Sequence, residues 1–187
     1  NWDYTKEMPG YLGGFTDDLV GCDTKLSLGY VYNATNNDQL YGITPPALGY
    51  DFFQGPQVGA TKLGLTSFNK YINGTDPASR NQTYNYMKGL KPDGSALVDP
   101  TTGLPTTFYH PGDPVTRTGW LDGSGADKRF MLSSGPFTMA PGDTQEVAFG
   151  YIAAQGGSVR EGIKLLRAQS DLVQLFYDNL DRGDAMP

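Results

Sequence analysis

Three aspartates near the start of the sequence, Asp17, Asp18 and Asp23, could supply oxygen ligands to a metal ion. They lie in a glycine-rich bend that includes Gly14 and Gly21. Calcium takes about six to eight hard oxygen ligands, and carboxylates on a bent loop are among its usual ones. Aspartates in such bends also cap turns through nearby backbone groups. The sequence therefore indicates calcium as the candidate ion, with turn capping as the alternative.

Four aromatic residues lie in or beside expected loops: Trp2, Tyr50, Tyr109 and Trp120. Exposed aromatic side chains on a β scaffold can stack on sugar rings. Tyr and Trp suit this role because each combines a flat apolar ring with a polar O–H or N–H group. Loop aromatics also cover the margins of a hydrophobic core. These four residues are the candidates for glycan binding.

Few residues could act as a nucleophile or a base. His110 is the single histidine and Cys22 the single cysteine, and neither has a second soft ligand nearby, so a zinc site is not expected. No G-x-S-x-G turn is present. Glycoside hydrolysis needs only two carboxylates, and with 20 Asp and Glu residues that reaction stays open. We nominate no catalytic residue and favour a protein without enzymatic activity.

The elements that would position these residues are mostly strands. Apolar residues alternate over Leu26–Tyr32, which predicts a half-buried strand. Shorter strands are expected at Leu48–Phe53 and Lys128–Ser133. Val147–Ala154 is almost wholly apolar and is typical of a central strand buried on both faces. Residues 1–24 carry no such pattern and are expected to form an irregular loop or an edge segment laid across a core.

A long helix is expected near the end of the chain. Ser158 and Glu161 form a capping box, and apolar residues follow at helical spacing, which predicts a helix over about 158–179. The stripe consists of Val159, Ile163, Leu166, Val173 and Tyr177. Residues 181–187 resemble the start of a linker. A short helix or turn is expected at Asn81–Leu90, and Lys91–Pro114 reads as a functional loop or a decorated hairpin.

Composition sets the fold class. Of 187 residues, 25 are Gly and 13 are Pro, and only 18% are charged, so few long helices are expected. The net charge is −6 with no basic run, which makes nucleic acid an unlikely partner. No apolar stretch approaches the roughly 20 residues that span a bilayer. We predict one mainly β domain over 1–180, a jelly-roll-like antiparallel β-sandwich with long loops and one C-terminal α-helix.

Four segments carry a resemblance to a known family. They are Val20–Asn33, Tyr41–Pro56, Thr66–Pro77 and Arg129–Gly157. Together they resemble an uncharacterised β-rich region of large secreted bacterial proteins whose chains often end in a type IX secretion sorting domain. The resemblance implies export, surface attachment and other domains of the same or neighbouring surface proteins as partners. It supplies no activity and no catalytic residues.

The leading hypothesis is a non-catalytic structural or adhesive module of an extracellular, cell-surface multidomain bacterial protein, stabilised by calcium. One alternative is a carbohydrate-active domain that binds or hydrolyses glycans. A further alternative is a subunit of an extracellular filament, completed by a strand from its neighbour. An organic cofactor is not expected.

Overall fold

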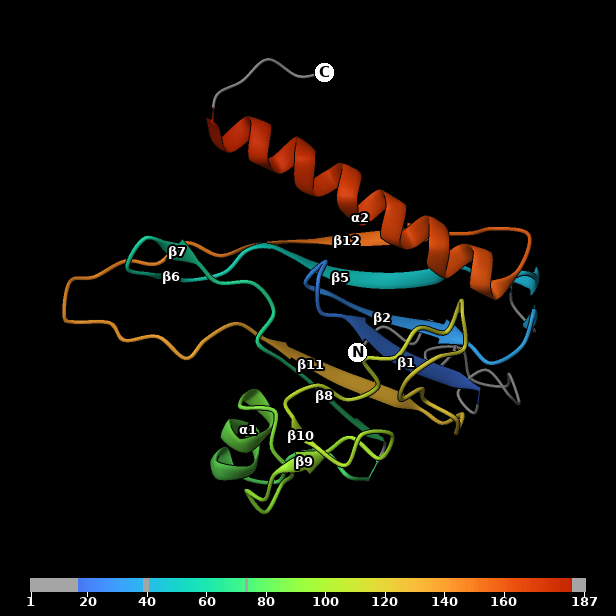
Figure 1. Cartoon of the computed structure of the whole chain (residues 1–187), viewed down its shortest axis with the longest axis horizontal. Helices are drawn as coiled ribbons and strands as arrows, with labels where there is room; N and C mark the ends of the chain where they lie inside the picture. Colours follow the sequence, from blue (N-terminus) through green and yellow to red (C-terminus); the bar gives the residue numbers. More distant parts are fainter. Residues whose placement is uncertain (1–16, 39–40, 73, 183–187) are drawn as a thin grey trace.

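A computed structural model describes residues 17–38, 41–72 and 74–182 as antiparallel sheets with a long helix near the C-terminal end (Figure 1). The strands are β1 (Asp18–Asp23), β2 (Leu28–Asn33), β3 (Asn37–Asp38), β4 (Gly42–Ile43), β5 (Ala47–Gln54), β6 (Gln57–Val58), β7 (Thr61–Lys62), β8 (Ser67–Ile72), β9 (Leu97–Val98), β10 (Pro105–Thr106), β11 (Lys128–Ser133) and β12 (Ala148–Ala154). The helices are α1 (Arg80–Met87) and α2 (Val159–Arg182). The mainly β class and the C-terminal helix are confirmed, and α1 is a second, short helix.

The largest sheet has the strand order β1-β2-β5-β12, with every neighbouring pair antiparallel. Strand β1 lies at one edge of this sheet, as the edge-segment interpretation of residues 1–24 predicted, but it is a regular strand, so the prediction of irregular structure was wrong there. The strand begins and ends with aspartate and contains Gly21, so only Val20 and Cys22 mark its buried face. Two residues are too few to show a strand pattern in the sequence. Strands β2, β5 and β11 fall where strands were expected.

Helix α2 covers one face of this sheet. Its buried residues Val159, Ile163 and Leu166 join side chains of β2, β5 and β12 in one hydrophobic core. The close approach of α2 requires a glycine in β5, because a Cβ at Gly49 would lie 3.3 Å from a methyl of Leu166 on α2 and 2.7 Å from a methyl of Leu28 on β2. The predicted stripe is confirmed, because Val159, Ile163, Leu166 and Val173 all pack in or against this core. The helix's other face exposes further apolar side chains: Leu165, Leu172, Leu175, Phe176 and Leu180.

The capping box forms as predicted at the start of α2. The backbone N–H of Glu161 donates to Oγ of Ser158 at 3.2 Å, and the carboxylate of Glu161 accepts from the N–H of Gly157 at 2.8 Å. Together these bonds satisfy donors that a helix start leaves without intrahelical partners. The helix runs on to Arg182, beyond the predicted end at 179, so the first two residues of the expected linker are helical.

Strands β8 and β11 form a two-stranded antiparallel ribbon that lies against the other face of the large sheet. Phe68 of β8 packs with Val20 and Cys22 of β1, while Phe130 and Leu132 of β11 pack against the same cluster. On its outer side the ribbon carries α1, held by side-chain hydrogen bonds from β8 to backbone carbonyls of residues 86–90. The segment 91–114 contains the small β9–β10 pair within otherwise irregular chain, as a decorated hairpin would.

Strand β12 is an edge strand of the large sheet in the described part of the chain, which corrects the prediction of a central strand buried on both faces. Ile152 and Ala154 are buried under α2, but Phe149 is 60% and Tyr151 45% exposed. The prediction was wrong because a strand with apolar side chains on both faces has the same sequence pattern whether one face is covered or both are. The uncovered face of β12 becomes the central feature of the site.

Candidate functional site

The three aspartates proposed for calcium do not gather in one place. Asp18 and Asp23 are the first and last residues of β1, so about 17 Å separates them at the usual rise of a strand. The side-chain amide of Asn33 donates to Asp17 at 3.3 Å and to Asp38 at 3.2 Å. The structure therefore brings Asp38, which sequence reasoning missed, close to Asp17, and leaves Asp23 apart from both.

Asp23 has a different set of contacts. Its carboxylate accepts hydrogen bonds from the backbone N–H groups of Lys25 and Leu26, as in the turn-capping alternative. It also lies 3.2 Å from Nε of Arg167 on α2. Within the described ranges, no group of three His, Cys, Asp or Glu side chains is placed to hold a metal ion. Calcium stabilisation stays a prediction.

The aromatic candidates fall into two separate groups, and Trp2 lies outside the described residues. Tyr109 and Trp120 have ring centroids 5.3 Å apart, and Trp120 packs edge-on against His110 at 4.9 Å. Tyr50 is on β5, where its ring lies 5.8 Å from Phe130. The rings of Tyr109 and Trp120 are half-buried against each other.

His110 belongs to a buried polar cluster beside that aromatic pair. Lys128 Nζ lies 3.0 Å from the carboxylate of Asp122, which also accepts the N–H of Val20 at 3.1 Å. His110 Nε2 is 3.7 Å from Asp122. Burial lowers the pKa of His110 to about 4, against the opposing effect of Asp122, so the imidazole is neutral at pH 7. The cluster holds the 110–128 segment against β1.

Cys22 lies next to this cluster but is not an activated thiol. Its Sγ contacts the carbonyl oxygen of Tyr109 at 3.5 Å, and its N–H donates to the carbonyl of His110. Burial, with a smaller effect of Asp23, raises the pKa of the Cys22 thiol well above its usual range. A nucleophilic cysteine needs the opposite shift, because the thiolate is the reactive form.

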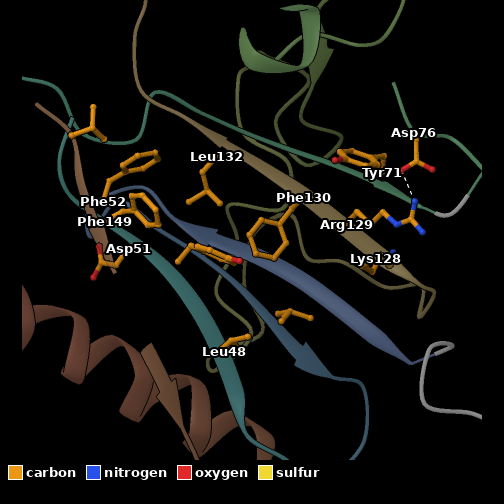
Figure 2. A pocket seen from close by; sticks show the side chains of 13 residues that line it. Leu48, Asp51, Phe52, Tyr71, Asp76, Lys128, Arg129, Phe130, Leu132 and Phe149 are labelled. Atoms are coloured by element: carbon orange, nitrogen blue, oxygen red, sulfur yellow. Dashed lines mark hydrogen bonds and ion pairs between the residues drawn. The ribbon is translucent and has the colours of Figure 1, made fainter. Parts of the chain in front are cut away.

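An apolar groove opens between the ribbon and the uncovered part of the large sheet (Figure 2). It has a volume of about 510 Å³. One wall is the face of β5 and β12, with Phe52 and Phe149, and the other is β11, with Phe130 and Leu132. The ribbon has two strands and the sheet has four, and within the described ranges no strand of the ribbon covers the exposed face of β12.

The charged groups that line the groove are engaged. Arg129 pairs with Asp76 at 2.5 Å, at the end of the groove farthest from Phe149 (Figure 2). Lys128 is paired with Asp122, and the carboxylate of Asp51 accepts a hydrogen bond from Ser170 under α2. The groove thus offers an apolar surface whose few charges are already neutralised or hydrogen-bonded.

Of the nominated residues that the structure describes, only Tyr50 lines this groove. The sequence carried one partial signal for the groove: Phe149 and Tyr151 make the second face of β12 apolar, although the pattern does not tell whether that face is covered. A strand with one solvent face normally alternates with polar residues.

No protein-family model, curated protein or solved structure matches this chain. Neither helix in the described part of the chain combines the length and the apolar character needed to cross a membrane.

Proposed function

We propose that this chain is a non-catalytic structural or adhesive module that holds other polypeptides through the groove between β11 and β12. The observation that carries the proposal is the uncovered apolar face of β12, where Phe149 is 60% exposed beside a cavity of about 510 Å³. In this proposal the fold is an antiparallel sandwich whose smaller layer covers only part of the larger one. Exposed apolar surface of this kind is typical of interaction sites.

The side chains that could act as a base or a nucleophile are held in structural contacts, which supports a binding role over a catalytic one. His110 is held neutral in a buried cluster, the Cys22 thiol is buried, and Asp23 is tied to Arg167. Each contact stabilises the packing of one element on another. The groove itself contains aromatic and aliphatic side chains rather than a pair of facing carboxylates.

The proposed setting is an extracellular, cell-surface multidomain bacterial protein, on the strength of the resemblance to secreted bacterial chains. Calcium stabilisation belongs to the same proposal, with Asp17 and Asp18 at the start of β1 as its ligands. Thermal unfolding in millimolar calcium and in a chelator tests it, because an ion that binds only the folded state raises Tm. Equal values of Tm would remove calcium from the proposal.

The binding role is tested by selecting ligands for the purified chain from a random peptide display library and, in parallel, on a glycan array. We expect selected peptides whose binding is lost in Phe149→Asp and retained in Ile43→Asp. The control carries the same change at an apolar side chain that is 77% exposed on β4, away from the groove. Glycan binding that survives Phe149→Asp, with no peptide selected, would favour the carbohydrate-active alternative.

A further inference from the structure

We propose that Lys128 and Asp122 condense within the folded chain to an isopeptide bond, a covalent amide between their side chains. The two residues form a buried ion pair between the first residue of β11 and the segment that precedes this strand. Formation of the bond needs no cofactor and no oxidant. The bond would be a modification of the chain itself, separate from any partner that the groove binds.

The distances within the pair bring the reacting atoms together. Nζ of Lys128 lies 3.1 Å from Oδ1 and 3.0 Å from Oδ2 of Asp122. Because both carboxylate oxygens are this close, Nζ lies within about 3.5 Å of the carbon that joins them, which is the separation of a near-attack arrangement. The two side chains are 1% and 2% exposed, so the surrounding fold keeps them in contact.

The surroundings of the pair make its two charges costly. His110 packs edge-on against Trp120, and its Nε2 lies 3.7 Å from Oδ1 of Asp122. Burial lowers the pKa of His110 to about 4, although Asp122 acts in the opposite direction. A site that keeps an imidazole neutral beside a carboxylate also disfavours an ion pair, because burial takes both charges out of water. Condensation removes the two charges together.

A second lysine adds to the cost of the charged pair. Burial lowers the pKa of Lys70 on β8, and the positive charge of Lys128 lowers it further, against the smaller opposing effect of Asp122. The repulsion between the two ammonium groups is therefore larger at Lys70 than the attraction to the carboxylate. Replacement of the ion pair by a neutral amide relieves this repulsion.

The reaction balances without an external reagent. One proton moves from the ammonium group of Lys128 to the carboxylate of Asp122, and the free electron pair on Nζ attacks the carboxyl carbon. The bond from Nζ to Cγ forms and the bond from Cγ to Oδ1 breaks. Oδ1 leaves as water with two of the three ammonium protons, and nothing is oxidised or reduced. The neutral ring of His110 can take up and return a proton at Oδ1.

The contacts of Asp122 distinguish the oxygen that stays from the oxygen that leaves. Oδ2 accepts the backbone N–H of Val20 at 3.1 Å, and as the carbonyl oxygen of the new amide it would keep this hydrogen bond to β1. Oδ1 faces His110 and accepts only a long hydrogen bond of 3.4 Å from the N–H of Ser124. Loss of Oδ1 therefore preserves the better of the two backbone contacts.

The test is the mass of the whole purified chain. Condensation removes one water, so the intact chain should be about 18 Da lighter than its sequence. Trypsin cleaves after lysine and arginine but not after an acylated lysine. The native chain should therefore give the peptide 118–129 with an internal link in place of the peptide 118–128. Fragmentation of the linked peptide should place the bond between Asp122 and Lys128.

Two variants identify the reacting amine. Lys128→Arg keeps a positive charge beside Asp122, but a guanidinium group does not condense with a carboxylate, so this variant should have its full sequence mass. Lys25→Arg changes an exposed lysine outside the cluster and should lose water as the native chain does. The mass and the peptides of the native chain decide the outcome even if Lys128→Arg does not fold.

Three results would overturn the bond. A native chain that keeps its full sequence mass after prolonged incubation at neutral pH contains the ion pair only. A loss of water that persists in Lys128→Arg, or that hydroxylamine reverses, comes from a succinimide in which the N–H of Gly123 attacks Asp122. A link from Asp122 to Lys70 would show that the neighbouring lysine is the one that reacts.

Discussion

Asp51 of β5 lies beneath helix α2, where its carboxylate accepts a hydrogen bond of 2.5 Å from the hydroxyl of Ser170. Both residues are almost fully buried, with exposures of 1%. Burial raises the pKa of Asp51 to about 6, although the bond from Ser170 acts in the opposite direction. The interface between α2 and the sheet therefore contains a carboxyl group whose charged form the fold disfavours.

This arrangement predicts that Asp51→Asn stabilises the protein near neutral pH. Asp51 has its pKa raised on folding from about 3.8, so its contribution is most favourable at low pH and is lost as the pH rises through about 6. Removing the charge should raise the free energy of unfolding at pH 7 by about 1 kcal/mol, and by much less at pH 4. Urea unfolding of both proteins at the two pH values measures the difference, and an equal difference at both would contradict the prediction.

Arg167 of α2 predicts a second change in stability. Its guanidinium reaches Asp23 at 3.2 Å and Asp113 at 2.7 Å and donates to the hydroxyl of Tyr30 at 3.3 Å. Arg167→Ala should lower the free energy of unfolding by about 2 kcal/mol, because these partners lose a charged hydrogen-bond donor. Arg160→Ala, on the exposed side of the same helix, is the control and should change stability by less than about 0.5 kcal/mol. Similar changes in the two variants would contradict the prediction, because only Arg167 has these partners.

Two positions on opposite faces of β12 should respond to truncation to very different extents. Ile152 is 6% exposed under α2, so Ile152→Ala should lower the free energy of unfolding by about 2–4 kcal/mol. Phe149 is 60% exposed, so Phe149→Ala should stay within about 1 kcal/mol of the native chain. Thermal and urea unfolding of the two variants and the native chain measure both changes in stability. A large loss for Phe149→Ala would mean that its face is covered within the chain itself.

Gly49 predicts the effect of adding a single methyl group. A Cβ at this position would lie 2.7 Å from Leu28 and 3.3 Å from Leu166, so Gly49→Ala should destabilise the chain by about 1–3 kcal/mol by forcing α2 away from β5. Gly123 is the matched control, since its added Cβ would meet no atom within 4 Å. The comparison is made by calorimetric Tm. Equal shifts in Tm would point to backbone entropy rather than to crowding at the helix.

The sequence predicted the parts of the fold whose pattern is local. The capping box at Ser158 and the apolar stripe that follows determine α2, and the alternation around Leu28–Tyr32 determines β2. Strand order is set by contacts between distant residues, so an apolar run such as Val147–Ala154 could not reveal that β12 is an edge. The groove was missed for the same reason, because it depends on how many strands the opposite layer has.

The aspartates show why the sequence did not predict which side chains lie close together. Asp17, Asp18 and Asp23 are close in sequence, but an extended strand carries Asp23 away from the other two. Asp38 is far from Asp17 in sequence, and the β1–β2 pairing brings it near through Asn33. Proximity along a chain predicts a cluster only when the intervening residues turn.

The pairing of β5 with β12 also bears on the order in which the chain can fold. Tyr50 and Tyr151 face each other across the two strands but are 101 positions apart, whereas β1, β2 and β5 are nearly consecutive. Closing so long a loop is slow compared with forming adjacent hairpins. During synthesis, β1, β2 and β5 can pair while most of the chain is still unmade, and β5 keeps its own edge open until β12 leaves the ribosome. A nascent chain must therefore be kept from pairing with others through β5, before β12 takes that place.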